Sequence, residues 1–190
     1  MTTPTEVLIE VAQVLEDLQI PYLVVGSFAS STRGVRRATV DADFVAQVTF
    51  DHVSRIVEKL SSRDFYVDEL AVQRAISFGS AFNAIHRESM FKVDVYVSHD
   101  DFSKEEMDRK LAEKILPNSD IVIYIATSED TVVAKLAWFR KGGEVSDRQW
   151  SDVLGVLKVQ QARLDYEYMT EWADRLGIRD LLDKAMAEAF

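Results

Sequence analysis

Two aspartates, Asp41 and Asp43, stand one residue apart in a segment, 41–48, whose polar and apolar residues alternate at first. Such alternation predicts a β-strand, in which successive side chains point to opposite faces. Both carboxylates are therefore expected on one face, with their Cα atoms about 6.6 Å apart, which is twice the rise per residue. Carboxylates at that spacing can share hard cations. Mg²⁺ in particular is often held by one or two carboxylates together with substrate phosphates.

A third aspartate, Asp94, has a similar setting in the segment 91–97. The apolar residues of this segment alternate, so Asp94 is expected on the opposite face, together with Lys92 and Tyr96. Aspartate is unfavourable in the middle of a strand. If the two strands are neighbours, the three carboxylates meet, and their mutual repulsion favours a bound cation. The alternative is that all three are solvated residues on an open sheet face.

A short apolar run, 22–25, leads into Gly26 and Ser27. The run predicts a buried strand followed by a turn and a short helix. Gly26 would let a ligand approach the backbone closely, and Ser27 could cap the helix or bind phosphate through its hydroxyl. Free amides at a helix N-terminus suit a triphosphate. Taken alone, a Gly-Ser pair is usually just a turn.

Taken together, these motifs resemble the nucleotidyltransferase superfamily with the polymerase-beta-like minimal fold. The resemblance lies in the order of a strand ending in Gly26-Ser27, a spacer of thirteen residues, Asp41-x-Asp43 and a later strand with Asp94. It implies an α+β fold with a mixed sheet flanked by helices, followed by a helical C-terminal region.

Three further segments are similar to the AbiEii-type branch of that superfamily, which includes toxin nucleotidyltransferases. Residues 37–43 look like the branch's aspartate motif, 128–135 its downstream lysine motif and 146–152 its Arg-x-x-x-Asp motif. This likeness implies a toxin-antitoxin setting with an antitoxin partner. The residues after Gly26-Ser27 do not match any one substrate class, so the acceptor stays open.

The resemblance implies a Mg²⁺-dependent enzyme of the EC 2.7.7 type that transfers a nucleoside monophosphate from a nucleoside triphosphate (NTP) to an acceptor hydroxyl. Asp41 and Asp43 would hold two Mg²⁺ ions, or Mn²⁺ in their place, and Asp94 would complete the catalytic one. The acceptor is expected to be an RNA end, with tRNA as the first candidate. The alternatives are a small molecule, a protein side chain, or a non-catalytic nucleotide-binding module.

The tail offers basic residues for the nucleotide. Lys135 lies in an apolar helical pattern, where it could reach the triphosphate or could be a surface lysine with a partly buried stem. Arg148 and Asp152 are four residues apart, so they could form an exposed ion pair or hold Arg148 towards phosphate. The resemblance favours nucleotide binding by Lys135 and Arg148, together with the Gly-Ser turn.

A basic stretch also separates the serine motif from the aspartate motif. Its three arginines are Arg33, Arg36 and Arg37. They form either a solvated loop or contacts to the substrate. The three histidines show no metal-ligand spacing, and there is no Walker-type loop.

The elements that must position these residues follow from periodicity and capping signals. A helix is expected from the capping box Thr3-Pro4-Thr5-Glu6 to Pro21. The remaining expected strands are 64–68, 82–87, 91–97 and 121–125, and the expected helices are 51–60, 69–78 and 103–115. Beyond residue 127 only helix signals occur, starting near 128, 146, 165 and 180. We therefore expect an α+β domain over 1–126 and a helical subdomain over 127–190.

Composition sets outer limits. The chain has 190 residues, no cysteine and a net charge of −10. It therefore has no disulfide framework and no thiolate zinc site, and its hydrophobic fraction of 47% is too high for a disordered chain. No apolar run is long enough for a membrane span and no signal peptide is visible, so a cytoplasmic protein without a membrane partner is expected. The acidic charge argues against a general nucleic-acid coat protein but leaves room for a local basic patch.

Overall fold

The computed structural model describes residues 2–35, 41–116 and 120–190, and it divides into two compact units. The first unit comprises Met1–Val25 and Thr39–Ile125, and the second comprises Gly26–Ala38 and Ala126–Phe190. Residues 26–38, which the sequence analysis placed in the first domain, thus group with the C-terminal helices. The two units are described one at a time.

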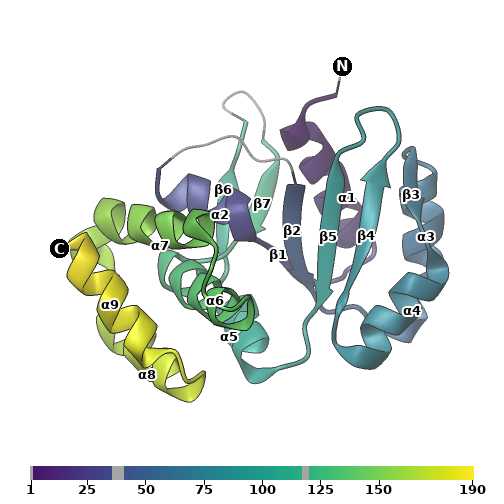
Figure 1. Cartoon of the computed structure of the whole chain (residues 1–190). Coiled ribbons are helices and arrows are strands. Elements are labelled where there is room, and N and C mark those ends of the chain that lie inside the picture. The colour runs from purple at the N-terminus through teal and green to yellow at the C-terminus, as the bar shows by residue number, and fades with distance from the viewer. Residues whose placement is uncertain (1, 36–40, 117–119) are drawn as a thin grey trace. The chain divides into compact units, whose positions relative to one another are not determined.

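The first unit is built on a mixed sheet, as expected, with seven strands in the described residues in the order β3-β4-β5-β2-β1-β7-β6 (Figure 1). The pairs β2–β5 and β1–β7 are parallel and the other neighbours are antiparallel. The strands are β1 (Tyr22–Val25), β2 (Asp41–Ala46), β3 (Phe65–Val67), β4 (Ala81–His86), β5 (Lys92–Val97), β6 (Leu111–Lys114) and β7 (Val122–Ile125).

One face of this sheet forms the core of the first unit. Its fully buried residues include Phe44 of β2, Phe82 of β4 and Val93 of β5. Helices of the same unit contact the strands: α1 packs near β2, α3 near β3, and α4 near β4 and β5. The helices are α1 (Pro4–Asp17), the 3₁₀ turn η1 (Phe50–His52), α3 (Val53–Ser61), α4 (Glu69–Phe78) and α5 (Asp101–Arg109).

Local signals explain where the first helix begins. The Thr3 hydroxyl accepts from the Glu6 amide at 3.3 Å, and the Glu6 carboxylate accepts from the Thr3 amide at 2.7 Å. This reciprocal pair is the predicted capping box.

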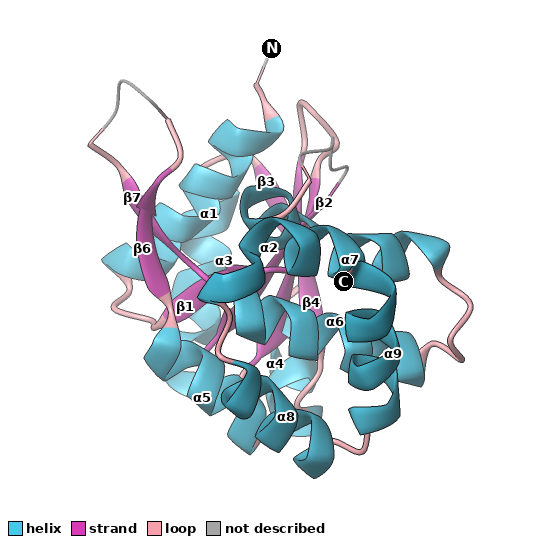
Figure 2. Cartoon of the chain, turned by 90° about the vertical axis from the view of Figure 1, so that its left-hand side faces the viewer, coloured by secondary structure: helices cyan, strands magenta, loops and turns pink. Residues whose placement is uncertain are grey.

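The predicted helix 103–115 is wrong at both ends. Helix α5 begins after Asp100, whose carboxylate accepts from the Ser103 amide at 2.7 Å, so Asp100 rather than Ser103 is the cap. The helix ends before Lys110, whose backbone is extended, and 111–114 form the edge strand β6 against β7. Strand β6 lies beside β7 at the edge of the sheet (Figure 2). It is largely exposed, so its sequence lacks the apolar alternation that marks a half-buried strand.

The second unit is helical throughout its described residues, as predicted for the tail. Its N-caps include Thr127, Ser146 and Asp165, each of which accepts from a backbone amide three residues on. Helix α2 contacts α6 and α7, and α7 also contacts α9. The helices are α2 (Gly26–Arg33), α6 (Ser128–Lys141), α7 (Asp147–Gln160), the 3₁₀ turn η2 (Gln161–Arg163), α8 (Tyr166–Arg175) and α9 (Arg179–Ala189).

The chain leaves α2 through a close crossing over α7. A Cβ atom on Gly34 would lie 2.8 Å from the Val156 amide nitrogen and 2.9 Å from the Gly155 carbonyl carbon. The side-chain amide of Gln160 also donates to the Arg33 backbone carbonyl at 2.5 Å. The end of α2 is thus hydrogen-bonded to α7 through Arg33 and Gln160. Gly34, which has no side chain, lets the backbone that follows lie close to α7. Across the described ranges, no helix combines the length and apolar character needed to cross a bilayer.

Candidate active site

The three aspartates lie on two adjacent strands of the first unit. Strand β2 lies between β5 and β1, and Asp43 is in register with Asp94 of the parallel strand β5. Asp41 is two residues before Asp43 and shares its face. Adjacent strands are about 4.8 Å apart, so the carboxylates of Asp43 and Asp94 start from neighbouring backbone positions. We call Asp41, Asp43 and Asp94 the carboxylate face.

The two faces of β2 differ as the sequence predicts. Ala42 and Phe44, on the core side, are fully buried, whereas Asp41 and Asp43 are half-buried. Asp94 is buried, with 8% of its surface exposed. A buried aspartate in mid-strand requires partners that offset the loss of hydration.

Asp94 has a partner at each carboxylate oxygen. The Lys92 Nζ lies 2.5 Å from Oδ2, and the side-chain amide of Asn83 donates to Oδ1. Asn83 is the β4 residue directly opposite Asp94 in the antiparallel β4–β5 register. The alternation in 91–97 predicts Lys92 on this face, but nothing in that pattern predicts Asn83. Asn83 could be found only from the exact register of the hairpin formed by 82–87 and 91–97, and the sequence does not define that register.

The charges of all three carboxylates raise the pKa values of two neighbouring side chains. The hydrogen bond to Asp94 raises the pKa of Lys92, and the negative charges of Asp94, Asp41 and Asp43 raise it further. Burial raises the pKa of Tyr96 to about 12, with further contributions from the same aspartates. The carboxylate face therefore acts as one negative electrostatic environment.

The donor chemistry of this face suits a hard divalent cation, because all three side chains offer carboxylate oxygens. Within the described ranges, however, no three acidic or histidine side chains are grouped so that they could hold a metal ion together. Asp94 is paired with the Lys92 ammonium. The assignment of Asp41, Asp43 and Asp94 as metal ligands therefore stays a prediction.

The chain continues from β1 directly into the Gly-Ser turn. Val25, the last residue of β1, is the antiparallel partner of Asp43, and Gly26 follows it in sequence. Gly26 has φ of 63°, a left-handed conformation that favours glycine, and it begins helix α2. The predicted strand, turn and short helix are confirmed.

Within the second unit, two of the predicted nucleotide-binding residues lie together. The exposed Arg148, near the start of α7, donates from Nη2 to the Ser27 hydroxyl at 3.3 Å. Ser27 lies in the first turn of α2. A guanidinium beside the first amides of a helix is an arrangement that can bind phosphate.

The other predicted nucleotide-binding residue, Lys135, is buried. Its Nζ lies 2.9 Å from Asp152 Oδ2, and each of the two side chains is 9% exposed. The sequence spacing predicts a pair of Asp152 with Arg148 on its own helix and does not predict the partner from α6. Asp152 therefore links α6 to α7.

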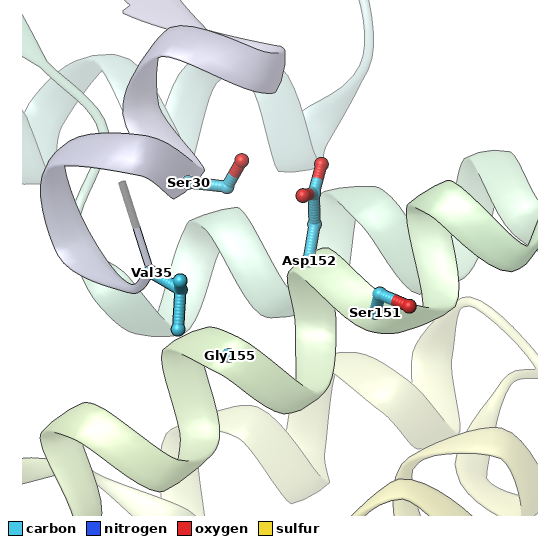
Figure 3. Close-up of a pocket in the computed structure, with 5 residues that line it drawn as sticks. All are labelled: Ser30, Val35, Ser151, Asp152 and Gly155. Atoms are coloured by element: carbon cyan, nitrogen blue, oxygen red, sulfur yellow. The ribbon is translucent and has the colours of Figure 1, made fainter. Parts of the chain in front are cut away.

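A cavity of about 270 Å³ adjoins this ion pair. Figure 3 shows Asp152 projecting from α7 towards the level of Ser30 of α2, with Val35 and Gly155 below these two residues in the view. Ser30 is buried, and its hydroxyl donates to the Ser27 carbonyl at 3.1 Å. The cavity is lined by Ser30, Val35, Ser151, Asp152 and Gly155.

Arg33, the first arginine of the basic stretch, has a structural contact inside the second unit. Its Nε donates to the Ala126 carbonyl at 3.2 Å, while its own carbonyl accepts from Gln160. Arg36 and Arg37 lie outside the described residues. Their assignment as substrate contacts stays a prediction.

The sequence matches no protein-family model and no curated protein. Several solved structures share its fold. ANT(2")-Ia in complex with adenylyl-2"-tobramycin has a TM-score of 0.59 at 11% identity, covering 94% of this chain and 99% of that one. An antigenic nucleotidyltransferase-like protein from Paracoccidioides brasiliensis has a TM-score of 0.53 at 16% identity, covering 95% and 91%. The lincomycin-bound lincosamide antibiotic adenylyltransferase LnuA has a TM-score of 0.51 at 13% identity, covering 83% and 98%.

These likenesses extend over most of both chains in each comparison. The mixed sheet, the flanking helices and the helical C-terminal part are those of the nucleotidyltransferase fold, which confirms the predicted fold class.

Proposed function

We propose that this protein is a metal-dependent nucleotidyltransferase, which moves a nucleoside monophosphate from an NTP to an acceptor hydroxyl. The observation that carries the proposal is the register of Asp43 with Asp94 on adjacent parallel strands, with Asp41 on the same face. The nucleotidyltransferase fold supports it, because the carboxylates lie on the central strands of that fold's sheet.

The reaction joins the acceptor oxygen to the α-phosphorus of the NTP and breaks the bond between that phosphorus and the bridging oxygen to the β-phosphate. The products are the nucleotidylated acceptor and pyrophosphate, and the hydroxyl proton passes to one of the carboxylates. Mg²⁺ ions held by Asp41, Asp43 and Asp94 would supply Lewis-acid activation of the hydroxyl and charge neutralisation of the leaving pyrophosphate.

The remaining predicted residues serve the phosphates in this proposal. The amides at the start of α2, at Gly26 and Ser27, donate to phosphate oxygens, and Arg148 supplies positive charge next to Ser27. The ammonium of Lys135 is buried in its ion pair with Asp152. In this proposal Lys135 therefore acts indirectly, by neutralising the Asp152 carboxylate.

For the acceptor, we favour the hydroxyl of a small molecule over the RNA end that the sequence analysis put first. One of the structures that share the fold is a lincosamide antibiotic adenylyltransferase with bound lincomycin, and another contains adenylyl-2"-tobramycin. The net charge of −10 agrees with this choice, since a tRNA-binding protein usually presents more positive charge. The AbiEii-type branch and an antitoxin partner stay predictions.

The test combines radiolabelled NTPs and Mg²⁺ or Mn²⁺ with three acceptor classes: hydroxylated small molecules such as aminoglycosides and lincosamides, total RNA, and protein. We expect label in a small molecule and release of pyrophosphate. The Asp41→Asn variant should lose both, while the control Asp101→Asn, at an exposed aspartate of α5, should retain both.

Each other outcome has a distinct meaning. Label in RNA would restore the RNA end as acceptor, and label in a protein band would point to a side chain. Binding of an NTP in a calorimeter without release of pyrophosphate would indicate a non-catalytic nucleotide-binding module. No labelling with any nucleotide, metal or acceptor class would count against the enzyme.

A further inference from the structure

We propose that Lys92 is a displaceable counter-ion of the carboxylate face, which neutralises Asp94 in the metal-free protein and leaves it when a divalent cation binds. The inference rests on the proposed function, because it concerns the same carboxylates. It adds that Lys92, by competing with the cation, sets the metal affinity of the site.

The first argument is the position of the ammonium. Lys92 Nζ lies 2.5 Å from Asp94 Oδ2, and it also interacts electrostatically with Asp41 and Asp43. Lys92 is in register with Asp41 on the neighbouring strand, so its side chain rises from the carboxylate face itself. An ammonium ion so placed lies at one of the positions that a cation bound to Asp94 could take.

The second argument is that both oxygens of Asp94 are engaged by the chain. Asn83 donates to Oδ1, and Lys92 occupies Oδ2. Each carboxylate oxygen has two lone pairs, so a cation can still bind Asp94, but only beside one of these two donors. Lys92 is the one that repels a cation, because the Asn83 amide is neutral.

The third argument is that Lys92 can leave at little cost in burial. Its side chain is 45% exposed, whereas the side chain of Asp94 is 11% exposed. The Lys135–Asp152 pair provides the contrast, since both of its side chains are 9% exposed. Lysine has a long flexible stem, so its ammonium can turn to water while Asp94 stays in place.

The test is a calorimetric titration of Mn²⁺ into the full chain and three variants, without nucleotide. Lys92→Met removes the charge with little change in length, and we expect it to tighten Mn²⁺ binding about tenfold. Lys92→Arg keeps the charge and should bind Mn²⁺ no more tightly than the natural chain. The matched control is Lys59→Met, at a lysine of the same unit that is 40% exposed and pairs with Asp17 at 3.1 Å. It should leave Mn²⁺ affinity unchanged.

A second measurement needs no variant. The acetylation rate of Lys92, read by mass spectrometry against that of Lys59, should rise when Mg²⁺ is added, because the ammonium is released to solvent. A faster rate with Mg²⁺ supports displacement even if Lys92→Met fails to fold.

Two results would overturn the inference while leaving the proposed function intact: equal Mn²⁺ affinity of the natural chain and Lys92→Met, or an acetylation rate that Mg²⁺ leaves unchanged. Nucleotidyl transfer by the natural chain would then stand on its own. Absence of Mn²⁺ binding in every variant would also overturn the inference, and the transfer assay with the natural chain and Asp41→Asn then decides separately whether the proposed function stands.

Discussion

Lys135 and Asp152 join α6 to α7 through a buried ion pair, with 2.9 Å between Nζ and Oδ2 and 9% of each side chain exposed. The same carboxylate lines the cavity next to Ser30. A buried ion pair of this kind adds little stability compared with apolar residues, but it is costly to break from one side. Asp152 is therefore both a link between helices and a wall of the cavity.

Replacing Lys135 by Met should lower the free energy of unfolding by about 3–5 kcal/mol, because it removes the buried ammonium that pairs with the Asp152 carboxylate. The double variant Lys135→Met/Asp152→Leu should recover much of that loss. Urea denaturation measures both. Lys158→Met, at an exposed lysine of α7, serves as control and should stay within about 0.5 kcal/mol of the natural chain. A loss below about 1 kcal/mol in the single variant would mean that water already solvates the pair.

Replacing the exposed Arg148 by Ala should leave the free energy of unfolding within about 0.5 kcal/mol, because its side chain is exposed and its hydrogen bond to Ser27 is long, at 3.3 Å. It should raise KM for the NTP about tenfold, since a positive charge beside the start of α2 is lost. Arg148→Lys should recover part of the affinity. Steady-state kinetics with varied NTP concentration tests this, and an unchanged KM would remove Arg148 from the nucleotide site.

The crossing of Gly34 over α7 gives a paired prediction of opposite signs. Gly34→Ala should destabilise the protein by about 1–3 kcal/mol, because its Cβ would meet backbone atoms of α7 at 2.8 and 2.9 Å. Gly155→Ala, inside α7, places its Cβ 3.5 Å or more from Val35 and should gain about 0.5–1 kcal/mol of helix propensity. Thermal unfolding of both variants decides this. Equal effects of the two substitutions would show that the crossing can relax.

Tyr96 should make stability depend on pH in the alkaline range. Its pKa is raised from 10.0 to about 12 in the folded protein, chiefly by burial. Between these values the unfolded tyrosine loses its proton while the folded one keeps it, so the free energy of unfolding should fall as pH rises from 10 to 12. The free energy of unfolding of the Tyr96→Phe variant should fall less steeply over the same pH range.

Urea denaturation at several pH values in that range measures the slopes. Tyr22, whose pKa is also raised by burial, remains in the variant and accounts for part of the residual slope. Tyr66→Phe, at an exposed tyrosine of β3, is the control and should leave the slope unchanged. Identical slopes for the natural chain and Tyr96→Phe would contradict the assignment.

Much of the fold could be predicted because local signals agree with tertiary packing. Helix α1 follows the capping box at Thr3, β1 is the buried run 22–25, and β2 lies in the alternating segment 41–48. The edge strand β6 could not be predicted, because it is mostly exposed and its strand state depends on pairing with β7. Pairing between distant segments overrides local propensity at such edges.

The candidate site was predictable at the level of strand faces and no further. Alternation placed Asp41 and Asp43 on one face, but only the register of two strands distant in sequence shows that Asp43 lies next to Asp94. Asn83 depended on a second register, between β4 and β5. The partner of Lys135 depended on the packing of α6 against α7, which a single sequence pattern does not encode.

The grouping of 26–38 with the C-terminal helices has a consequence for dissection of the protein. Because the second unit takes α2 from the middle of the first unit's sequence, it is not a contiguous module that fusion could add or proteolysis could remove. A cut at residue 126 would produce two fragments. The N-terminal fragment would contain α2 without α6 and α7, and the C-terminal fragment would contain α6 and α7 without α2. Gene fragments that end there should yield aggregating products, and the smallest piece that keeps α2 with its partners is one that carries both segments of the second unit.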